Sequence, residues 1–186
     1  MTDTGPLVMT IGHSTRSFDE FLELLEENGC RTVIDVRSLP RSRRYPHFDR
    51  AALAASLAGR GIGYRHCAPL GGLRRPLPPA ESVNRGLRNE RFRAYADHMQ
   101  TEEFAEAVAR LVDLARKDRT VIMCAEAVPW RCHRSLIADA LLARGCRVLH
   151  IIDRGPAEGH RLHKEAVVTE GKISYPVDPK QQRLGL

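Results

Sequence analysis

The sequence contains no long apolar run and no secretory signal, which excludes two broad classes of protein. No apolar stretch among its 186 residues approaches the ~20 that a membrane-spanning helix requires. The first residues lack the basic and apolar regions of a signal peptide. We therefore expect a cytoplasmic protein that has no membrane partner.

The sequence lacks a regular, even-numbered set of cysteines, which excludes a small disulfide-stapled scaffold. The five cysteines follow no disulfide pattern, so in a reducing compartment they should be thiols, metal ligands or core residues. Cys30 and Cys146 each occur in the tripeptide Gly-Cys-Arg, directly before a predicted strand. We assign these two to core packing, because a free cysteine buries as a small apolar residue.

Lysine is almost absent, although the chain is basic. The formal net charge is +6, yet only four lysines occur, and arginine supplies nearly all of the positive charge. Arginine forms forked contacts with phosphate and carboxylate groups, which favours an anionic ligand. A GC-rich genome would give the same bias, so the clustering of the arginines is more informative than their number.

Short apolar runs alternate with amphipathic segments along most of the chain. The runs predict strands at 7–11, 32–36, 120–124 and 147–152, and residues 62–66 form a weaker strand pattern. Helical patterns begin near residues 18, 50, 92, 102 and 132. This alternation indicates an α/β fold: a single domain with a mainly parallel sheet of about five strands and helices on both faces. We expect residues 1–153 to form this domain and 154–186 to be a C-terminal extension, either a short hairpin or a tail. A long loop that ends near residue 87 is predicted to be a lid or a mobile excursion.

Polar and reactive side chains follow three of the predicted strands. His13 and Ser14 come after the first, Asp35 and Arg37 after the second, and Cys124 ends the fourth. Ligands of parallel sheets bind beyond the carboxyl ends of the strands, so these residues should converge. The segment that follows Cys124 adds further polar residues to the same edge: Glu126, Arg131, Cys132, His133 and Arg134.

The residue types at this edge are those of nucleophilic catalysis. A thiol at a helix N-terminus beside arginine ionises easily, which suits Cys132, whereas Cys124 has the more rigid position at a strand end. We predict that one of them is the nucleophile or a ligand, and that Glu126 or His133 is the acid–base group. The residues expected to hold an anion are Arg37, Arg131 and Arg134.

Two other kinds of site use these residue types but fit the spacing less well. The loop between Cys124 and Arg131 is one residue longer than that of a cysteine phosphatase, and it lacks the small residues of a phosphate cradle. A catalytic metal site would draw on Cys124, Cys132 and His133, but adjacent residues at a helix start point in different directions. No metal and no other cofactor is assigned.

An arginine-rich loop, residues 37–44, supports a hypothesis from another class. Its basic side chains suit nucleic acid, and the cysteines would then be structural. A base could stack on nearby aromatic residues, namely Tyr45, Phe48 and Trp130.

Asp35 is the one charged residue inside an otherwise apolar strand. A buried carboxylate is costly unless it is paired or hydrogen-bonded. We therefore expect it to bind Arg37, His13 or a backbone loop, and a pair with Arg37 would hold the loop rather than a ligand.

Five ordered motifs between residues 8 and 153 together resemble the DUF488 family. They are Thr10-Ile11-Gly12-His13-Ser14, Asp35-Val36-Arg37-x-x-Pro40-x-Ser42, Leu70-Gly71-Gly72, Tyr95-Ala96-x-x-Met99 and Cys124-x-Glu126-x5-Cys132-His133-Arg134. The resemblance implies a bacterial or archaeal cytoplasmic protein without an established activity. Some members carry a DNA-repair label, which hints at nucleic acid. The second motif adds Ser42 to the candidate ligand-binding residues.

The sequence thus supports two hypotheses. In the first, the protein is an enzyme, or a former enzyme, whose pocket at the strand carboxyl ends binds an anionic, nucleotide-like ligand. In the second, it is a nucleic-acid-binding module associated with DNA repair. The candidate catalytic residues are Cys124, Glu126, Cys132 and His133, and the candidate ligand-binding residues are His13, Ser14, Asp35, Arg37, Ser42, Arg131 and Arg134.

Overall fold

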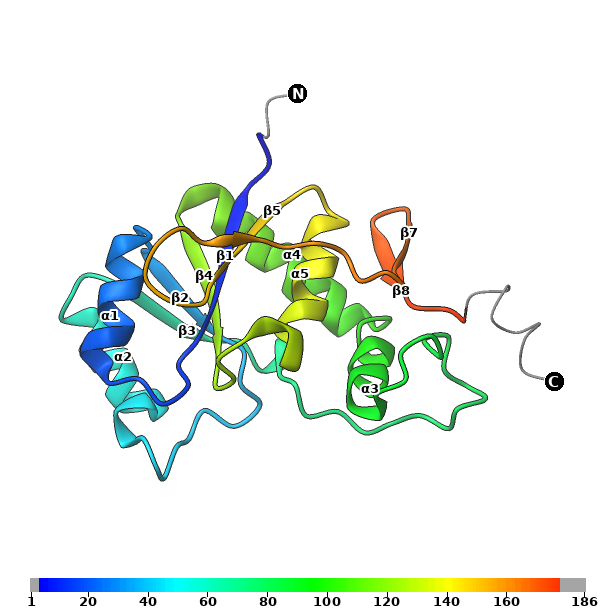
Figure 1. The fold of residues 1–186 in the computed structure, drawn as a ribbon, viewed down its shortest axis with the longest axis horizontal. Helices are drawn as coiled ribbons and strands as arrows, with labels where there is room; N and C mark the ends of the chain where they lie inside the picture. The colour runs from blue at the N-terminus through cyan, green and yellow to red at the C-terminus, as the bar shows by residue number, and fades with distance from the viewer. Residues whose placement is uncertain (1–3, 178–186) are drawn as a thin grey trace.

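A mainly parallel β-sheet forms the centre of the computed structural model, which describes residues 4–177 (Figure 1). The strand order is β3-β2-β4-β1-β5-β6, and β6 alone is antiparallel to its neighbour. The α/β prediction is confirmed, with one short strand more than expected. The strands of this sheet are β1 (Leu7–Gly12), β2 (Thr32–Asp35), β3 (Gly63–His66), β4 (Thr120–Cys124), β5 (Arg147–Ile151) and β6 (Glu158–Gly159).

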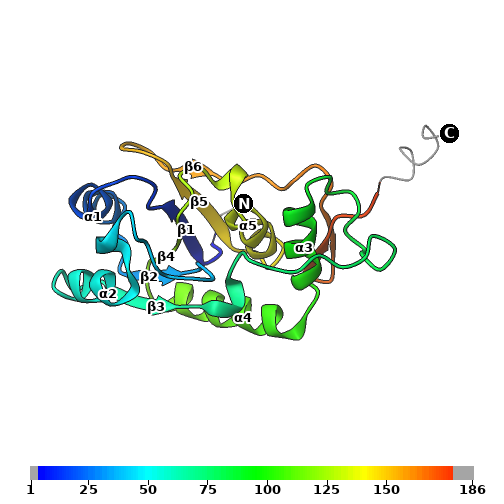
Figure 2. The ribbon, with the colours of Figure 1, turned by 90° about the horizontal axis from the view of Figure 1, so that it is seen from below.

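Helices cover both faces of the sheet. The α-helices are α1 (Phe18–Glu27), α2 (Arg50–Ala58), α3 (Glu90–His98), α4 (Glu102–Lys117) and α5 (Arg134–Leu142), and the short 3-10 turns are η1 (Pro46–Phe48), η2 (Ala68–Leu70) and η3 (Pro129–Arg131). Alternate residues of each strand point to opposite faces. Met9 and Val33 therefore pack with α1 and α2, whereas Val8 and Ile34 pack with α4 and α5. Figure 2 shows the sheet between these layers, with α3 on the outer side of α5.

Local signals set the helix starts. Ser17 and Glu20 form a reciprocal capping box at the start of α1, as the Ser-x-x-Glu pattern indicates. Asn89 and Thr101 cap α3 and α4 through their side-chain oxygens. Within residues 4–177, no helix combines the length and the apolar character that crossing a bilayer would require.

The connections around β1 and β4 diverge at the centre of the sheet. These two strands are neighbours, and Gly12 pairs with Cys124 at their carboxyl ends. The chain leaves β1 through α1 on one face and leaves β4 through α5 on the other. A parallel sheet opens a crevice where neighbouring connections diverge in this way. The crevice needs glycine at position 12, because a Cβ there would lie 1.8 Å from the carbonyl oxygen of Glu126.

The long loop before α3 and the C-terminal segment hold one another in place. Ser82 and Asn84 both donate hydrogen bonds to Asp97 of α3, and the side-chain oxygen of Asn84 accepts one from the backbone of Tyr175. Tyr175 is fully buried and follows a hairpin formed by β7 (Val167–Thr169) and β8 (Lys172–Ser174). The loop is therefore anchored at its middle. The end of the predicted extension, residues 178–186, lies outside the described residues.

Candidate active site

Two thiols meet at the carboxyl edge of the sheet. Cys124 is the last residue of β4, and Cys132 lies between η3 and α5. Their Sγ atoms are 2.8 Å apart, and both cysteines are free and buried. At this separation a hydrogen bond between the sulfurs is possible with either cysteine as the donor.

The imidazole ring of His133 lies against the sulfur of Cys132. Its Nε2 lies 3.0 Å from the carbonyl oxygen of Val36, which can only accept, so Nε2 carries a hydrogen. Its Nδ1 lies 3.5 Å from the Sγ of Cys132. The ring fits closely against Gly72, where a Cβ would lie 2.5 Å from Nδ1. This geometry allows either a neutral thiol and imidazole or a thiolate and imidazolium.

Arg134 brings a positive charge beneath the thiol pair. The side chain is fully buried, and its guanidinium donates to the backbone carbonyls of Glu126 and Ala127 and to the hydroxyl of Thr10. Its Nε has no partner, and no carboxylate among residues 4–177 lies within ion-pair distance of the guanidinium. The backbone N–H of Arg134 also points to the Sγ of Cys132 at 3.5 Å.

These surroundings shift the pKa values of the two thiols in opposite directions. Burial alone raises the pKa of Cys132, but hydrogen bonds from Cys124 and His133 and the charges of His133 and Arg134 outweigh it and bring that pKa well below the usual value. Burial and the hydrogen bond to Cys132 hold the pKa of Cys124 well above the usual value. These directions favour Cys132 as the member of the pair that ionises first.

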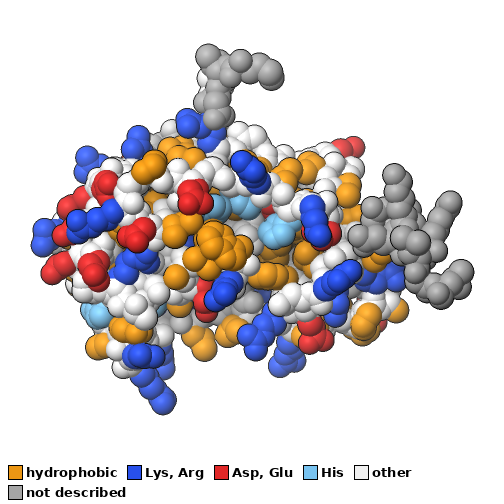
Figure 3. Space-filling view, in the orientation of Figure 1, with side chains coloured by type: hydrophobic (Ala, Val, Ile, Leu, Met, Phe, Trp, Pro, Cys, Tyr) orange, Lys and Arg blue, Asp and Glu red, His pale blue; other side chains and the backbone are white. Residues whose placement is uncertain are grey.

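A cavity of about 450 Å³ opens onto the pair, and it is lined by a mixture of cationic and apolar side chains. Arg41, Arg91 and Arg131 line it, and none of their guanidinium groups hydrogen-bonds to another described residue. Glu126 is the one acidic residue in its wall. Figure 3 shows basic side chains along the lower edge of the molecule, over the loops that leave the strands in Figure 1.

Most of the predicted site residues contribute to the wall of this cavity. They are His13, Arg37, Ser42, Cys124, Glu126, Arg131, Cys132 and His133. Three predicted residues, Ser14, Asp35 and Arg134, do not line it. Arg41, which was predicted only as part of the nucleic-acid-binding loop 37–44, also lines it. Arg91 lines it but was not among the candidates, because an arginine at a helix start carries no local signal of where it will point.

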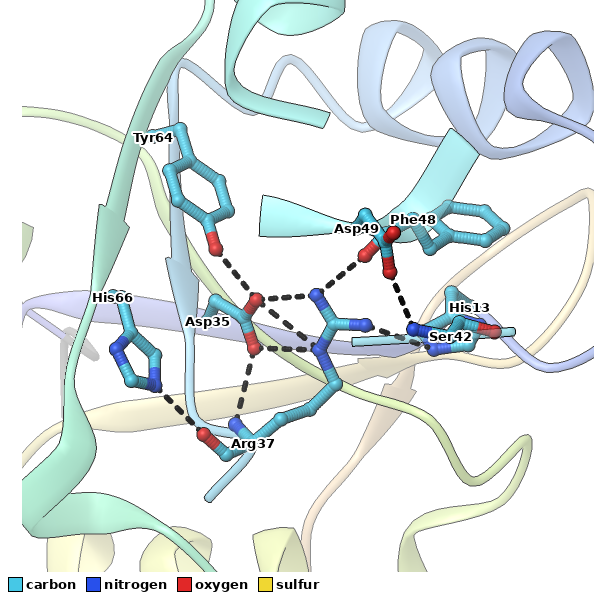
Figure 4. A network of polar contacts seen from close by, with 8 residues as sticks. All are labelled: His13, Asp35, Arg37, Ser42, Phe48, Asp49, Tyr64 and His66. Atoms are coloured by element: carbon cyan, nitrogen blue, oxygen red, sulfur yellow. Dashed lines mark hydrogen bonds and ion pairs between the residues drawn. The ribbon is translucent and has the colours of Figure 1, made fainter. Parts of the chain in front are cut away.

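Asp35 and Arg37 form an internal ion pair (Figure 4). The guanidinium Nη2 of Arg37 lies 2.6 Å from Asp35 Oδ2 and also donates to the carbonyl of Phe48 at 2.8 Å. The hydroxyl of Tyr64 donates to the same carboxylate at 2.6 Å. Of the partners considered for Asp35, the one it binds is Arg37, and the pair holds the loop after β2. The carboxylate also compensates the charge of Arg37.

His13 is a neutral wall of the cavity. Its ring stacks on Phe48, with centroids 4.3 Å apart, and its Nδ1–H donates to the carbonyl of Ser14 at 3.0 Å. Burial and the neighbouring charge of Arg37 lower the pKa of His13 to about 4. Its partner Phe48 is buried and offers no face to a nucleic-acid base.

Ser42 makes hydrogen bonds within its own loop. Its backbone N–H donates to the carboxylate of Asp49 (Figure 4). Its hydroxyl accepts from the backbone of Tyr45 at 3.0 Å. These bonds form a local turn. The turn presents the neighbouring Arg41 to the cavity.

A second polar chain, which sequence reasoning missed, runs behind the thiol pair. The hydroxyl of Thr10 lies 2.8 Å from His150, the His150 ring lies 2.9 Å from that of His160, and His160 lies 2.7 Å from the carboxylate of Asp139. The same carboxylate accepts from His163 and Tyr175 of the C-terminal segment. Because Thr10 also accepts from Arg134, the chain joins that segment to the thiol site.

A separate cavity of about 520 Å³ lies beside this chain. Its lining includes Pro129 and Trp130, whereas the next two residues, Arg131 and Cys132, line the thiol cavity. Trp130 is 57% exposed. The turn η3 therefore forms a wall that both cavities share, and the predicted stacking role of Trp130 does not belong to the thiol cavity.

The donor groups do not assemble a metal site. Among residues 4–177, no group of three or more histidine, cysteine, aspartate or glutamate residues has a geometry that could hold a metal ion. Cys132 and His133 contact each other rather than a common centre.

Comparison with known proteins identifies a family that the chain matches. The model of the family described as "Domain of unknown function DUF488" matches residues 17–141. This range includes both thiols, His133 and Arg134, but it ends before β5 and the C-terminal histidines. Neither the curated proteins nor the solved structures contain a match to the chain.

Proposed function

The chain belongs to the DUF488 family, and we propose that it is a thiol-dependent enzyme whose nucleophile is Cys132 and whose cavity binds an anionic small molecule. The observation that carries the proposal is the 2.8 Å contact between two thiols beside a buried arginine that has no carboxylate partner among residues 4–177. A buried guanidinium without a counter-charge is strongly unfavourable. A thiolate at Cys132 supplies that charge.

The surrounding groups divide the work of nucleophilic catalysis. Cys132 attacks, and Cys124 stabilises the thiolate by donating its S–H hydrogen. His133 receives the proton of Cys132 at Nδ1, while its Nε2 stays fixed on the carbonyl of Val36. Glu126, in the cavity wall, is placed to exchange a proton with the bound substrate.

The charges of the cavity select the substrate. Arg41, Arg91 and Arg131 form no ion pair with another residue of the described range 4–177, and one carboxylate, that of Glu126, shares the wall with them. The remaining wall includes apolar side chains, among them Leu39 and Phe92. A small molecule with a carboxylate or phosphate group and an apolar portion matches this wall.

Alkylation with a matched pair of reagents tests the proposal. At about pH 6, iodoacetamide should modify Cys132 at least about tenfold faster than Cys146, since burial raises the pKa of Cys146 and an ordinary thiol is then protonated. Iodoacetate carries the same reactive group with a negative charge. Its rate relative to iodoacetamide should be about tenfold higher at Cys132 than at a free thiol in solution.

Variants separate the contributions of Cys132, Cys124 and Arg131 to the alkylation rate. Cys132→Ser should abolish the fast phase, and Cys124→Ala should move its pH midpoint upward because the donor to the thiolate is lost. Arg131→Ala should lower the iodoacetate-to-iodoacetamide ratio without removing reactivity. If Cys132 reacts no faster than Cys146 at about pH 6, the assignment of the nucleophile is wrong.

Nucleic-acid binding is the second candidate, and the observation in its favour is the exposure of Arg41, Arg43 and Arg44 in the loop after β2. A salt titration of single-stranded DNA binding tests it. Binding through these arginines would weaken steeply with salt and would not change in Cys132→Ser. Weak binding that does not depend on salt would exclude this candidate.

A further inference from the structure

We infer that Cys124 and Cys132 act together as a redox pair that reduces a small anionic disulfide. The inference rests on the proposed function, because it uses the same nucleophile and the same cavity. It adds a role for the second thiol, a class of substrate and a direction of electron flow.

The geometry of the pair favours bond formation between the two sulfurs. They lie 2.8 Å apart, and a disulfide bond would need an approach of only about 0.8 Å more. Cys124 is held by a fully buried strand and Cys132 by the start of a buried helix. A thiolate and a thiol at this separation can close to a disulfide with little movement of either element.

The asymmetry of the pair assigns an order to the two thiols. Cys132 is the thiolate and attacks first, whereas Cys124 stays protonated until the first leaving thiolate takes its proton. Cys124 also lies within reach of the Cys132 sulfur from the moment a mixed disulfide forms there.

The cavity indicates which oxidant the pair accepts. About 450 Å³ is far more space than a peroxide occupies, and three uncompensated arginines would serve no purpose for an uncharged oxidant. Leu39, Leu73 and Phe92 add an apolar wall. A disulfide of low molecular mass with carboxylate groups combines the soft electrophilic sulfur, the negative charge and the apolar carbon chain that these walls accommodate.

The reaction proceeds in two exchanges. The Cys132 thiolate attacks one sulfur of R–S–S–R′, so that the bond between Cys132 and R–S forms, the substrate S–S bond breaks and R′–S⁻ leaves. The proton of Cys124 passes to this leaving thiolate. Cys124 then attacks the Cys132 sulfur, the protein disulfide forms and R–S⁻ leaves. The substrate gains two electrons, and the protein pair loses two.

A thiol reductant closes the cycle. Two molecules of a monothiol, or one dithiol, reduce the protein disulfide by the reverse exchanges and restore the Cys132 thiolate. The co-reactant is therefore a low-molecular-mass thiol or a dithiol protein.

Two disulfides of similar size and opposite charge test the inference on the full chain. Dithiodipropionate is anionic and cystamine is cationic, while their dialkyl S–S groups are alike. Pre-reduced protein is mixed with each, quenched by acid and alkylated, and the state of each cysteine is read by peptide mass spectrometry. Dithiodipropionate should close the Cys124–Cys132 disulfide about tenfold faster than cystamine, and this preference should shrink in Arg131→Ala.

Variants trap the intermediate. Cys124→Ser should accumulate a mixed disulfide of mercaptopropionate on Cys132, and Cys124→Ala repeats the test if the serine variant fails to fold. Cys132→Ser should form no adduct on Cys124. Cys146→Ser is the matched control, because Cys146 precedes β5 at the opposite end of the sheet, and it should behave as the wild type.

The outcomes distinguish this inference from the proposal on which it rests. If Cys132 is alkylated rapidly at low pH but no Cys124–Cys132 disulfide forms with either reagent, the redox pair is refuted and the nucleophile stands. If hydrogen peroxide closes the pair faster than dithiodipropionate, or cystamine matches the anion, the substrate class is wrong. If Cys132 is not nucleophilic at all, both fail together.

Discussion

Mild acid should destabilise this protein, because two of its buried histidines are neutral in the folded state. His13 is stacked on Phe48 beside the Arg37 guanidinium, and His150 lies between Thr10 and His160. Burial is the main cause in each case, followed by the charge of Arg37 for His13 and of His160 for His150, and the pKa of each is lowered to about 4.

The sign and the size follow from proton linkage. Between the folded pKa of about 4 and the unfolded value near 6.5, the unfolded chain binds more protons, so stability falls as the pH falls through this window. At about pH 5 each imidazole costs about 2 kcal/mol relative to neutral pH, and the two together cost about 4 kcal/mol. His163 acts in the opposite direction, because Asp139 raises its pKa and its contribution is lost as the pH rises.

Urea unfolding at about pH 7 and about pH 5 measures the effect. The free energy of unfolding of the wild type should be about 3–4 kcal/mol lower at the acidic pH. His150→Gln and His13→Gln should each reduce this difference by about 2 kcal/mol, whatever they do to stability at neutral pH. If both variants lose as much stability on acidification as the wild type, these imidazoles are not held neutral by the fold and the reasoning is refuted.

Three further substitutions test close contacts in the structure. Gly72→Ala should displace the His133 ring and slow the alkylation of Cys132 severalfold, whereas Gly159→Ala, which meets no atom within 4 Å, should leave it unchanged. Asp139→Asn should lower the free energy of unfolding by about 2–4 kcal/mol in a urea titration, because the buried carboxylate accepts from two histidines and Tyr175. Tyr64→Phe should cost about 1–2 kcal/mol in the same titration, because it removes one of the hydrogen bonds that Asp35 accepts.

The sheet and the location of the thiol site could be predicted from sequence because both depend on local patterns. Each of the five parallel strands coincides with a predicted strand, within one residue at either end, although β3 contains Arg65 and His66 and is not apolar. The rule that ligands bind beyond parallel strand ends then brought Cys124, His13 and Arg37 together without knowledge of the strand order. The family match has narrower bounds than the motifs indicated, residues 17–141 against 8–153.

The polar chain behind the site could not be predicted, because its partners are far apart in sequence. Thr10 and His150 are 140 residues apart and meet only because β1 and β5 are neighbours. His160 and His163 lie in a segment without periodicity, so nothing local distinguishes them from a solvated tail. The one available signal was Asp139, a carboxylate in the middle of an apolar helix, which required a partner that the helix itself does not supply.

The direct contact between the two thiols could not be predicted from the sequence either. Their separation in sequence allowed a metal site, a phosphate cradle or two unrelated cysteines. The turn η3, which returns the chain so that Cys132 faces Cys124, depends on Pro129 and on tertiary packing.

The wall that the two cavities share also gives the protein an intrinsic optical reporter. Trp130 is the only tryptophan in the chain, so all of the tryptophan emission comes from this turn. A molecule that enters the 520 Å³ cavity would contact the indole of Trp130. Formation of a disulfide between Cys124 and Cys132 would shift the backbone two residues after this tryptophan. Occupancy on one side and oxidation on the other could therefore be followed in unlabelled wild-type protein, in real time and with a single detector.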